Sequence, residues 1–356
     1  MTNSETIKEK LHHSLANLEK YEKCALLDYP DYLNLGDHLI WLGSVLYLTE
    51  VNHTKIGYAA SVKNFSAREM EEKIGKAPIF LNGGGNLGDL WGECQRFREK
   101  IITQYQDRPI VILPQSIYFK NLENLKKTAN IFNSHPDLTI FVRDSLSYQL
   151  ATEYFIKCQI FLAPDMAFQM VNNLNKEQQQ KNSNSILYLC RDDRELNQTF
   201  APSQLGLSNL VIADWVSYKW VLGVEKTQLM RLVATLFREG WQRGLATPQE
   251  WLSRQQWLAS HPYTPKFKNL KYSSLHSRSW HFIHSAIYQL QQHELVITNR
   301  LHGHILSILL NKPHIFLPNA YHKNELFYQT WTTEIPFCKF VKDLDKISTS
   351  VSELLS

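Results

Sequence analysis

Short apolar runs alternate with longer amphipathic stretches along most of this chain, and this rhythm constrains its fold more than any other feature. Each run is brief and almost wholly apolar, which is typical of a parallel strand buried on both faces. Such strands, separated by helix-length segments, predict a parallel sheet wrapped by helices. The expected strands are Cys24–Leu27, Lys55–Ala59, Pro78–Leu81, Ile110–Leu113, Leu138–Val142, Gln159–Ala163, Ile186–Cys190, Asn209–Ala213, Leu295–Thr298 and His314–Leu317; the expected helices include His38–Glu50, Asp89–Gln106, Asn121–Asn133 and Ser145–Phe155.

A polar segment at residues 172–185 interrupts this pattern near the middle of the chain. It is rich in Asn, Gln and Lys and nearly devoid of apolar residues, a composition that favours an exposed linker. A chain of 356 residues is also longer than most domains that are built on a single hydrophobic core. We therefore expect two Rossmann-like, doubly wound α/β domains, at 1–171 and 186–356, facing a cleft in which ligands bind.

The overall composition indicates which classes of binding partner, and which cellular compartment, to expect for this protein. A net charge of +4 without dense Lys/Arg runs argues against nucleic acid, but suits an anionic small substrate or peripheral contact with an anionic membrane. The five cysteines are scattered and lack CxxC spacing, which favours reduced thiols. The N-terminus lacks the apolar region of a signal peptide, and no apolar run approaches the ~20 residues of a spanning helix. We expect a cytoplasmic protein.

The histidines do not indicate a metal site. The chain has 14 of them but no HExxH motif, and no cofactor is expected from any other pattern. Most lie in polar contexts and are expected at the surface, namely His12, His13, His53, His135, His261, His276, His281, His284 and His293.

The most informative motif is Arg300-Leu301-His302, between the expected strand Leu295–Thr298 and a helix that Lys312-Pro313 would end. At such a junction the first helical N–H groups are unpaired and the helix dipole favours anions. A guanidinium and an imidazole there can hold a phosphate or carboxylate and deliver a proton. The alternative is that Arg300 only caps the strand edge and His302 is simply polar. Arg191 and Lys323 follow other strands of the same half and can add positive charge.

Two glycine-containing motifs follow strands of the first half. Asn34-Leu-Gly-Asp37 predicts a tight turn in which Asp37 caps the next helix. The run Gly83-Gly84-Gly85 suits a close approach of ligand to backbone or a nest of N–H groups that binds an anion. Asp89 can cap the helix that comes after this run. Neither motif is a dinucleotide or nucleotide-binding signature.

Polar residues are also expected where three further strands of the first half end. Gln115 and Ser116 would project into the crevice after Ile110–Leu113. Asp144 either caps the helix Ser145–Phe155 or lines the same crevice. Asp165 follows Gln159–Ala163, and buried carboxylates in such places are functional or paired.

Taken in order, these motifs resemble the polysaccharide pyruvyl transferase family. The resemblance extends from about Leu27 to Trp331 and depends on seven motifs in sequence, none of them decisive alone. They are Asn34-Leu-Gly-Asp37, Gly83-Gly-Gly85, Gln115-Ser-Ile117, Arg143-Asp144 with Ser147, Asp165-Met-Ala-Phe168, Arg300-Leu-His302 and Tyr321-His-Lys323.

This resemblance implies a fold similar to GT-B glycosyltransferases, with phosphoenolpyruvate as donor and a sugar or lipid-linked oligosaccharide as acceptor. Arg300, Leu301 and His302 match the donor-binding Arg-Leu-His of the family, and Arg191 matches its further donor-binding arginine. The acceptor is expected on the N-terminal side, at Asn34, Asp37, Gly83, Gly84, Gly85, Asp89, Gln115 and Ser116. The chain departs from the family at Tyr118-Phe119, where many members have Gly-Pro, and at Asn82, where an acidic residue is frequent.

The residues suit the chemistry of ketal formation, which requires an acid, an anion clamp and a base. His302 fits the acid, and Arg300, Arg191 and Lys323 fit the clamp. Asp37, Asp89 or Asp165 could serve as base. Two alternatives stay open: a glycosyltransferase with a nucleotide-sugar donor, whose ribose Glu325 could bind, and a catalytically silent domain that binds anionic glycans.

Overall fold

The computed structural model describes residues 3–32, 34–174, 184–190, 200, 204–207, 209–215, 248–260, 267–319 and 323–356. The chain divides into two compact units, each described here by itself. The N-terminal unit comprises Ser4–Asp31 and Leu39–Val171. The C-terminal unit comprises Asn172–Ser356 together with Met1–Asn3 and Tyr32–His38. The domain boundaries expected from the sequence stay a prediction.

The N-terminal unit is built on a seven-stranded sheet in which every pairing is parallel. Its main path runs β2-β1-β3-β5-β6-β7, and β4 pairs with β5 beside that path. Most strand residues are buried, as a parallel sheet covered on both faces requires, and the main exception is the edge strand β7, none of whose residues is fully buried. The strands are β1 (Lys23–Leu27), β2 (Lys55–Ala60), β3 (Ile79–Leu81), β4 (Gly84–Gly88), β5 (Ile110–Tyr118), β6 (Leu138–Val142) and β7 (Gln159–Leu162).

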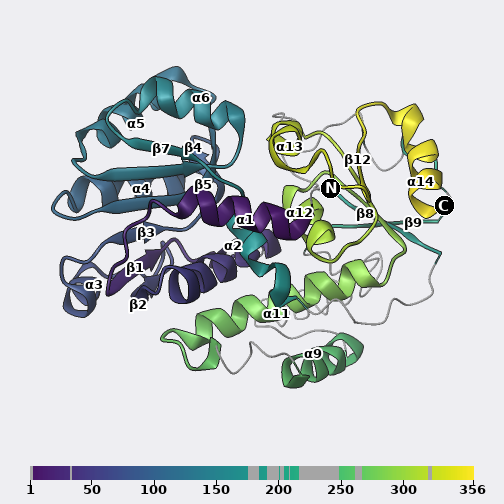
Figure 1. The fold of residues 1–356 in the computed structure, drawn as a ribbon, viewed down its shortest axis with the longest axis horizontal. Coiled ribbons are helices and arrows are strands. Elements are labelled where there is room, and N and C mark those ends of the chain that lie inside the picture. The colour runs from purple at the N-terminus through teal and green to yellow at the C-terminus, as the bar shows by residue number, and fades with distance from the viewer. Residues whose placement is uncertain are drawn as a thin grey trace, which may run out of the picture. The chain divides into compact units, whose positions relative to one another are not determined.

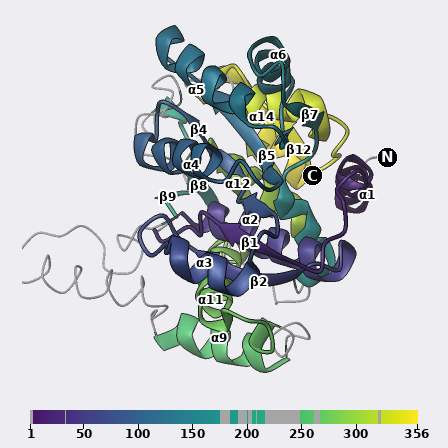
Figure 2. The ribbon, with the colours of Figure 1, turned by 90° about the vertical axis from the view of Figure 1, so that its left-hand side faces the viewer.

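Helices of the N-terminal unit connect these strands and cover the sheet (Figure 1). Figure 2 shows α4 and α5 side by side, in contact. Side chains cap the N-termini of three of these helices: Ser66 caps α3, Asn121 caps α5, and Asp144 caps α6 as its position in the sequence predicts. The helices are α1 (Ser4–Leu15), α2 (Leu35–Leu46), the π-helical turn η1 (Tyr47–Val51), α3 (Ala67–Ile74), α4 (Gly92–Gln104), α5 (Leu122–Ser134), α6 (Ser145–Tyr154) and the 3₁₀ segment η2 (Met166–Asn173). The start of α2, up to His38, and the end of η2, from Asn172, belong to the C-terminal unit.

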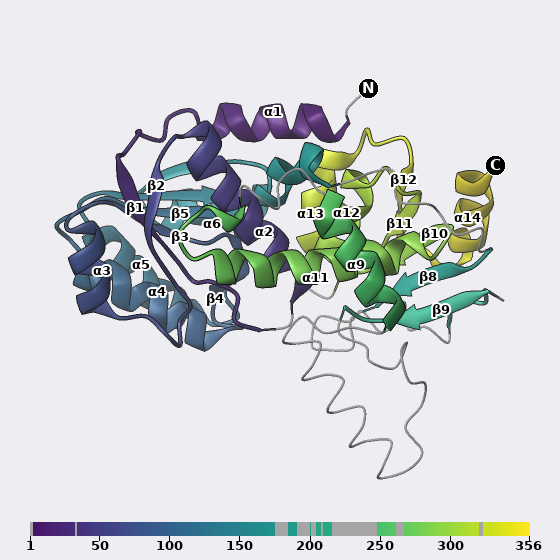
Figure 3. The ribbon, with the colours of Figure 1, turned by 90° about the horizontal axis from the view of Figure 1, so that it is seen from below.

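The C-terminal unit contains a second parallel sheet, in the order β12-β11-β10-β8-β9. Alternate residues of β8, β10 and β11 pack with α14, whereas α12 contacts β10 and β11 through its own buried face. Figure 3 shows β8 and β9 adjacent and α9 alongside α11. The elements are β8 (Ile186–Leu189), β9 (Leu210–Ala213), α9 (Pro248–Ser260), α11 (Ser273–Gln291), β10 (Leu295–Thr298), α12 (Leu301–Leu309), β11 (His314–Phe316), α13 (Lys323–Phe327), η5 (Tyr328–Thr332), β12 (Cys338–Phe340), η6 (Leu344–Lys346) and α14 (Ile347–Leu355).

The predicted α/β class with parallel sheets is confirmed, with three local corrections. The glycine run was not predicted to form a strand, but Gly84–Gly88 forms β4. Strand β5 was expected to end at Leu113, but it continues to Tyr118. The short strand β12 was not predicted, because three residues are too few to give a recognisable strand pattern. No helix among the described ranges is long and apolar enough to cross a membrane.

Candidate active site

Arg300 and His302 lie where strand β10 gives way to helix α12, as predicted. Arg300 has an extended backbone and occupies the N-cap position, and Leu301 and His302 begin the helix. The hydroxyl of Thr298 fixes this junction: it accepts from the backbone N–H of Arg300 at 3.0 Å and donates to the carbonyl of Leu189 at 3.0 Å. The backbone that carries both candidate donor-binding side chains is thereby tied to the neighbouring strand β8.

A second polar side chain, which the sequence did not single out, holds the same junction from the other side. The amide of Asn324 donates to the carbonyl of Asn299 at 2.7 Å and to that of Leu317 at 2.9 Å. Asn324 is 2% exposed, so these bonds lie in a dry environment where loss of a partner is costly. Lys323, the candidate cation, precedes Asn324 at the first position of α13.

Gly36 packs against the ring of His302. A Cβ atom placed on Gly36 would lie 2.3 Å from Nδ1 of His302 and 2.5 Å from its Cβ. Contacts that close do not occur between real side chains, so only glycine fits beside this imidazole. The Asn34–Asp37 motif and the Arg300–His302 motif, more than 260 residues apart in sequence, therefore meet within the C-terminal unit.

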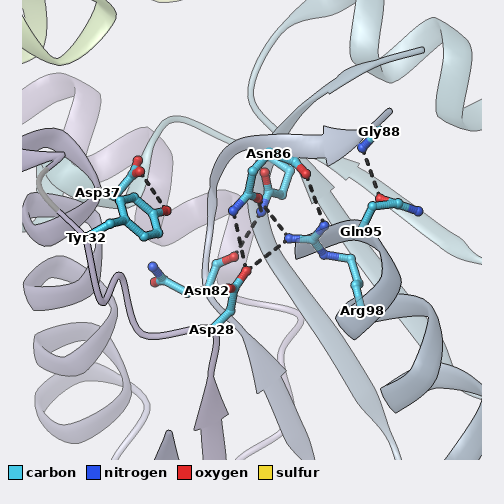
Figure 4. Close-up of polar contacts among 9 residues, drawn as sticks. Asp28, Tyr32, Asp37, Asn82, Asn86, Gly88, Gln95 and Arg98 are labelled. Atoms are coloured by element: carbon cyan, nitrogen blue, oxygen red, sulfur yellow. Dashed lines mark hydrogen bonds and ion pairs between the residues drawn. The ribbon is translucent and has the colours of Figure 1, made fainter. Parts of the chain in front are cut away.

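Asn34 organises the turn that presents Asp37. The Oδ1 atom of Asn34 accepts from the backbone N–H of Gly36 at 3.2 Å, and its amide donates to Oδ2 of Asp37 at 2.8 Å. The hydroxyl of Tyr32 also donates to that oxygen, at 2.9 Å (Figure 4). Helix α2 begins at Leu35, so Asn34 is the capping residue and the predicted capping role of Asp37 is wrong. Asp37 is instead a half-buried carboxylate held by two donors.

His38 anchors this turn to helix α11, a role that sequence inspection missed. Its Nε2–H donates to the carbonyl of Tyr32 at 3.1 Å, and its Nδ1 accepts from Ser279 at 2.9 Å. The ring also stacks on Phe282 with centroids 4.4 Å apart. Burial lowers the pKa of His38 to about 3, a net value that includes the opposing effect of the hydrogen bond to Tyr32 and a smaller lowering by the positive charge of Arg278. His38 is therefore a neutral structural imidazole.

Arg300 forms a bidentate ion pair with Asp214, the residue that follows β9. Its Nε bonds Oδ1 of Asp214 and its Nη2 bonds Oδ2. Strands β9 and β10 flank β8 in the same parallel sheet, so their carboxyl ends lie on one edge. Arg191, the other candidate donor-binding arginine, lies outside the described residues, as do Tyr321 and His322.

The glycine run of the N-terminal unit is explained by close packing of strands. A Cβ on Gly83 would lie 2.6 Å from the carbonyl oxygen of Pro114, and Gly84 adopts a φ of 138°, which L side chains rarely adopt. Gly85 lies against Arg143, whose Nη2 would be 3.1 Å from an added Cβ. The run thus lets β4 pair closely with β5.

A buried polar network lies under this glycine strand (Figure 4). Arg98 donates from Nη2 to Asp28 at 3.3 Å and to Oδ1 of Asn86 at 2.9 Å. Gln115 donates to the same Asn86 oxygen at 3.1 Å and to the carbonyl of Asn82 at 2.9 Å. Asp28 has a φ of 66°, in the left-handed region that costs a non-glycine residue conformational energy. The network was not predicted, since its members are separated by up to 87 residues in sequence.

Ser116 and Asp165 belong to a second buried cluster, centred on Arg143. The guanidinium donates from Nε to Ser116 at 2.9 Å and from Nη1 to Asp165. Ser116 in turn donates to Asp144 at 2.7 Å, and the backbone N–H of Ala167 donates to Asp165 at 2.8 Å. Gln115 and Ser116 were expected to project into a crevice beyond the strand end, but both lie inside β5 and are at most 1% exposed.

Asp89 bonds to the start of α5 instead of capping α4, whose N-cap is Trp91. Its carboxylate accepts from the backbone N–H groups of Lys120 at 2.8 Å and Asn121 at 2.9 Å. Partial burial raises its pKa, but these bonds and one from Asn124 together hold the pKa below its usual value. The predicted capping of the next helix is therefore wrong.

Three buried side chains, one each from α12, β11 and β12, converge on one point in a way that could hold a metal ion: His304, His314 and Cys338. The Nδ1–H of His314 donates to the carbonyl of Lys312 at 2.8 Å, which leaves its Nε2 to accept from Nδ1–H of His304 at 2.8 Å. Burial lowers the pKa of both imidazoles and raises that of the thiol. The set could ligate Zn²⁺, but a neutral hydrogen-bond chain ending at Thr332 already satisfies both rings.

The surface location expected for several other histidines is wrong. His135, His276 and His284 are buried, at 2%, 0% and 0% exposure. His135 donates to the carbonyl of Tyr105 at 3.0 Å, and His276 does so to the carbonyl of Lys271 at 3.0 Å. His276 and His284 lie on α11 and His135 directly follows α5, and sequence context alone does not show which side chains of such segments are buried. His261 lies outside the described residues.

Comparison with known proteins agrees with the motifs. Residues 34–321 match the sequence profile described as polysaccharide pyruvyl transferase. EpsO of Bacillus subtilis, whose name assigns it provisionally as a pyruvyl transferase, is 33% identical over 344 residues, which cover 96% of this chain and 95% of EpsO. Pyruvyl transferase 1 of Schizosaccharomyces pombe is 25% identical over 317 residues, 87% of this chain and 70% of that protein.

A solved structure shares the fold. A functionally uncharacterised protein of Klebsiella pneumoniae superposes with a TM-score of 0.58 at 19% identity, covering 96% of this chain and all of that one. At that identity the likeness concerns the fold alone. The extent of the profile match and the identity to EpsO establish that this chain belongs to the polysaccharide pyruvyl transferase family, a family of transferases.

Proposed function

We propose that this protein transfers the pyruvyl group of phosphoenolpyruvate to two hydroxyls of one sugar, forming a pyruvate ketal and releasing inorganic phosphate. The observation that carries this proposal is the Arg300-Leu301-His302 motif at the start of α12, with Gly36 packed on the imidazole. A guanidinium and an imidazole at a helix N-terminus suit a small dianion or trianion that must also be protonated.

The proposed reaction balances without an oxidant, a reductant or a metal ion. A proton adds to the methylene carbon of the enol, and the first sugar hydroxyl attacks the adjacent carbon as it loses its own proton. The C–O bond to phosphate then breaks, and the second hydroxyl attacks the same carbon and loses its proton. The products are the ketal and phosphate. The protein needs an acid, an anion clamp and a base.

Each of these parts has a candidate in the C-terminal unit. We assign the acid to His302 and the clamp to Arg300, assisted by Lys323 and Arg191. Of the three carboxylates considered as base, Asp37 is favoured: it is half-exposed and directly follows the glycine that touches His302. Asp165 is completely buried in its pair with Arg143, and Asp89 is bonded to the start of α5.

Acceptor binding is proposed for Asn34 and Asp37 and, in the N-terminal unit, for Gly83, Gly84, Gly85 and Asp89. Gln115 and Ser116 are proposed to contribute by holding Asn86 and Arg143 in place. We further propose that the two units are the Rossmann-like domains of a GT-B-like fold and that the acceptor is a glycan or lipid-linked intermediate of exopolysaccharide synthesis. The reaction would take place in the cytoplasm, at the inner face of the membrane where the acceptor is lipid-linked.

The test is release of phosphate from phosphoenolpyruvate, screened over glycan acceptors with detection of the ketal by mass. Phosphate release that depends on an acceptor and yields that mass supports the proposal. Turnover of a nucleotide sugar instead would show the glycosyltransferase alternative, in which Glu325 would have to leave Lys342 and Gln329 to reach a ribose. Acceptor binding with no turnover of either donor would show a glycan-binding domain without catalysis.

A further inference from the structure

The carboxylate of Asp214 occupies one defined edge of the Arg300 guanidinium. It bonds Nε and Nη2, which form the side-on edge of the planar group. An arginine has five N–H donors in a rigid plane, so this pair uses two of them. The three that remain include the end-on pair, one N–H on Nη1 and one on Nη2, which can form a second bidentate contact.

Both side chains of the pair are held in a partly dry environment. The side chain of Arg300 is 11% exposed and that of Asp214 is 29% exposed. Asp214 is in turn fixed by the backbone, since its Oδ1 accepts from the N–H of Trp215 at 2.7 Å. Trp215 is 2% exposed, so the segment after β9 is anchored by a buried indole. The carboxylate thus has a stable position from which to orient a long, flexible side chain.

We propose that Asp214 is a positioning residue for the donor site: it fixes the plane of Arg300 so that the end-on edge faces the anionic group of the donor. This inference rests on the proposed function, because it assumes that Arg300 binds phosphoenolpyruvate. Arg300 would otherwise sample many rotamers, and ordering them during binding would weaken the complex. Asp214 also partly neutralises Arg300, so its geometric benefit must exceed that electrostatic cost. At this exposure water and salt screen that cost only in part.

The experiment compares Asp214→Ala and Asp214→Asn with the wild type in two measurements: binding of phosphoenolpyruvate by calorimetry, and steady-state kinetics with each substrate varied. Asp214→Ala is expected to raise the donor Kd and the donor KM about 10-fold or more, as for a displaced binding group, with the acceptor KM unchanged. Asp214→Asn keeps one acceptor oxygen with the same shape, and is expected to recover part of this loss. Asp345→Ala removes an exposed carboxylate of the same unit and serves as the matched control.

A double variant separates positioning from a general effect on the fold. If Asp214 acts through Arg300, Asp214→Ala costs little further donor affinity in an Arg300→Lys background, because the planar fork is already lost. Additive losses overturn the inference. So does tighter donor binding in Asp214→Asn, since Asp214 would then be a competitor of the donor.

The failure of the proposed function gives a different result. If the wild type neither binds nor turns over phosphoenolpyruvate, the proposed function fails and the inference about the donor site fails with it. If the wild type binds it, and both Asp214 variants bind it as tightly as Asp345→Ala does, only the inference about Asp214 fails.

Discussion

Gly36 and His302 are in direct contact, so the start of helix α2 sets the position of the candidate acid on α12. The contact reaches the Cβ of His302 as well as Nδ1, at 2.5 Å and 2.3 Å from an added Cβ. Rotation about the side-chain bonds therefore does not relieve the clash, and one of the two elements must move. Substitution of Gly36 is therefore a direct test of how much the position of His302 matters.

Gly36→Ala is accordingly expected to lower kcat by about 10- to 100-fold, the usual effect of misplacing a reacting group by about 1 Å. Donor affinity should change less, because Arg300 is held separately by Thr298 and Asp214. Gly75→Ala provides a control for the cost of a glycine substitution: Gly75 has a φ of 58° but nothing within 4 Å of an added Cβ, so it should affect stability and leave kcat unchanged. Equal kcat in Gly36→Ala and wild type would contradict the role of this contact.

His302→Gln tests the acid itself. Loss of general acid catalysis is expected to reduce kcat by about 10²- to 10⁴-fold while donor binding stays within a few-fold, since the cations still hold the anion. In deuterated solvent the wild type should place deuterium in the ketal methyl group and show a solvent isotope effect. Near-normal kcat in His302→Gln would assign protonation to a carboxylate or a water molecule instead.

The buried histidines predict loss of stability in mild acid. Burial lowers the pKa of His38 to about 3 and those of His276 and His314 to about 4, whereas an unfolded histidine titrates near 6.5. Between these values the unfolded chain binds more protons than the folded protein. The stability that these neutral histidines contribute is therefore fully present above about pH 6.5 and is lost as the pH falls toward 4. Each group contributes a slope of about 1.4 kcal/mol per pH unit in that window.

Urea unfolding from pH 8 to pH 4.5 measures this slope. His276→Gln keeps a donor for the carbonyl of Lys271 but cannot be protonated, so its stability should fall less steeply with acid by about one proton. Above pH 7 its curve should run parallel to that of the wild type. Identical slopes below pH 6.5 would show that His276 does not contribute.

The sequence predicted the elements that carry the Arg300-Leu301-His302 motif because local signals there agree. The run Leu295–Thr298 is apolar and β-branched, and Lys312-Pro313 follows the end of α12, so both bounds could be predicted. Strand β4 is the opposite case. Glycine has no strand preference, and Gly84–Gly88 is extended only because β5 lies beside it, a long-range contact that local pattern does not contain.

The same distinction applies to the residues of the site. Arg300 and His302 could be chosen from their place at a strand end. Asp214 and His38 could not, because their roles depend on partners 86 and 241 residues away. Asn34 and Asp37 were identified as a turn, but the sequence assigned the cap to the wrong member. Either side chain can accept from a helix N–H, and only the position of the first turn decides between them.

The last prediction concerns Asp165, whose burial is complete and whose partner Arg143 is 3% exposed. Removing one member of a buried ion pair leaves an uncompensated charge and costs about 3–5 kcal/mol. Asp165→Asn is therefore expected to lower the free energy of unfolding by an amount of that order. Arg143→Met should have a similar effect, because it leaves the carboxylate without its guanidinium.

The double variant Asp165→Asn with Arg143→Met decides whether the pair is structural. It removes both charges, so it should be less destabilised than the sum of the two single variants. Urea unfolding gives the three free energies, and kcat measured well below each midpoint gives the activity of the folded fraction. If Asp165→Asn instead unfolds like the wild type but has lost two or more orders of magnitude in kcat, the base must be reassigned from Asp37 to Asp165.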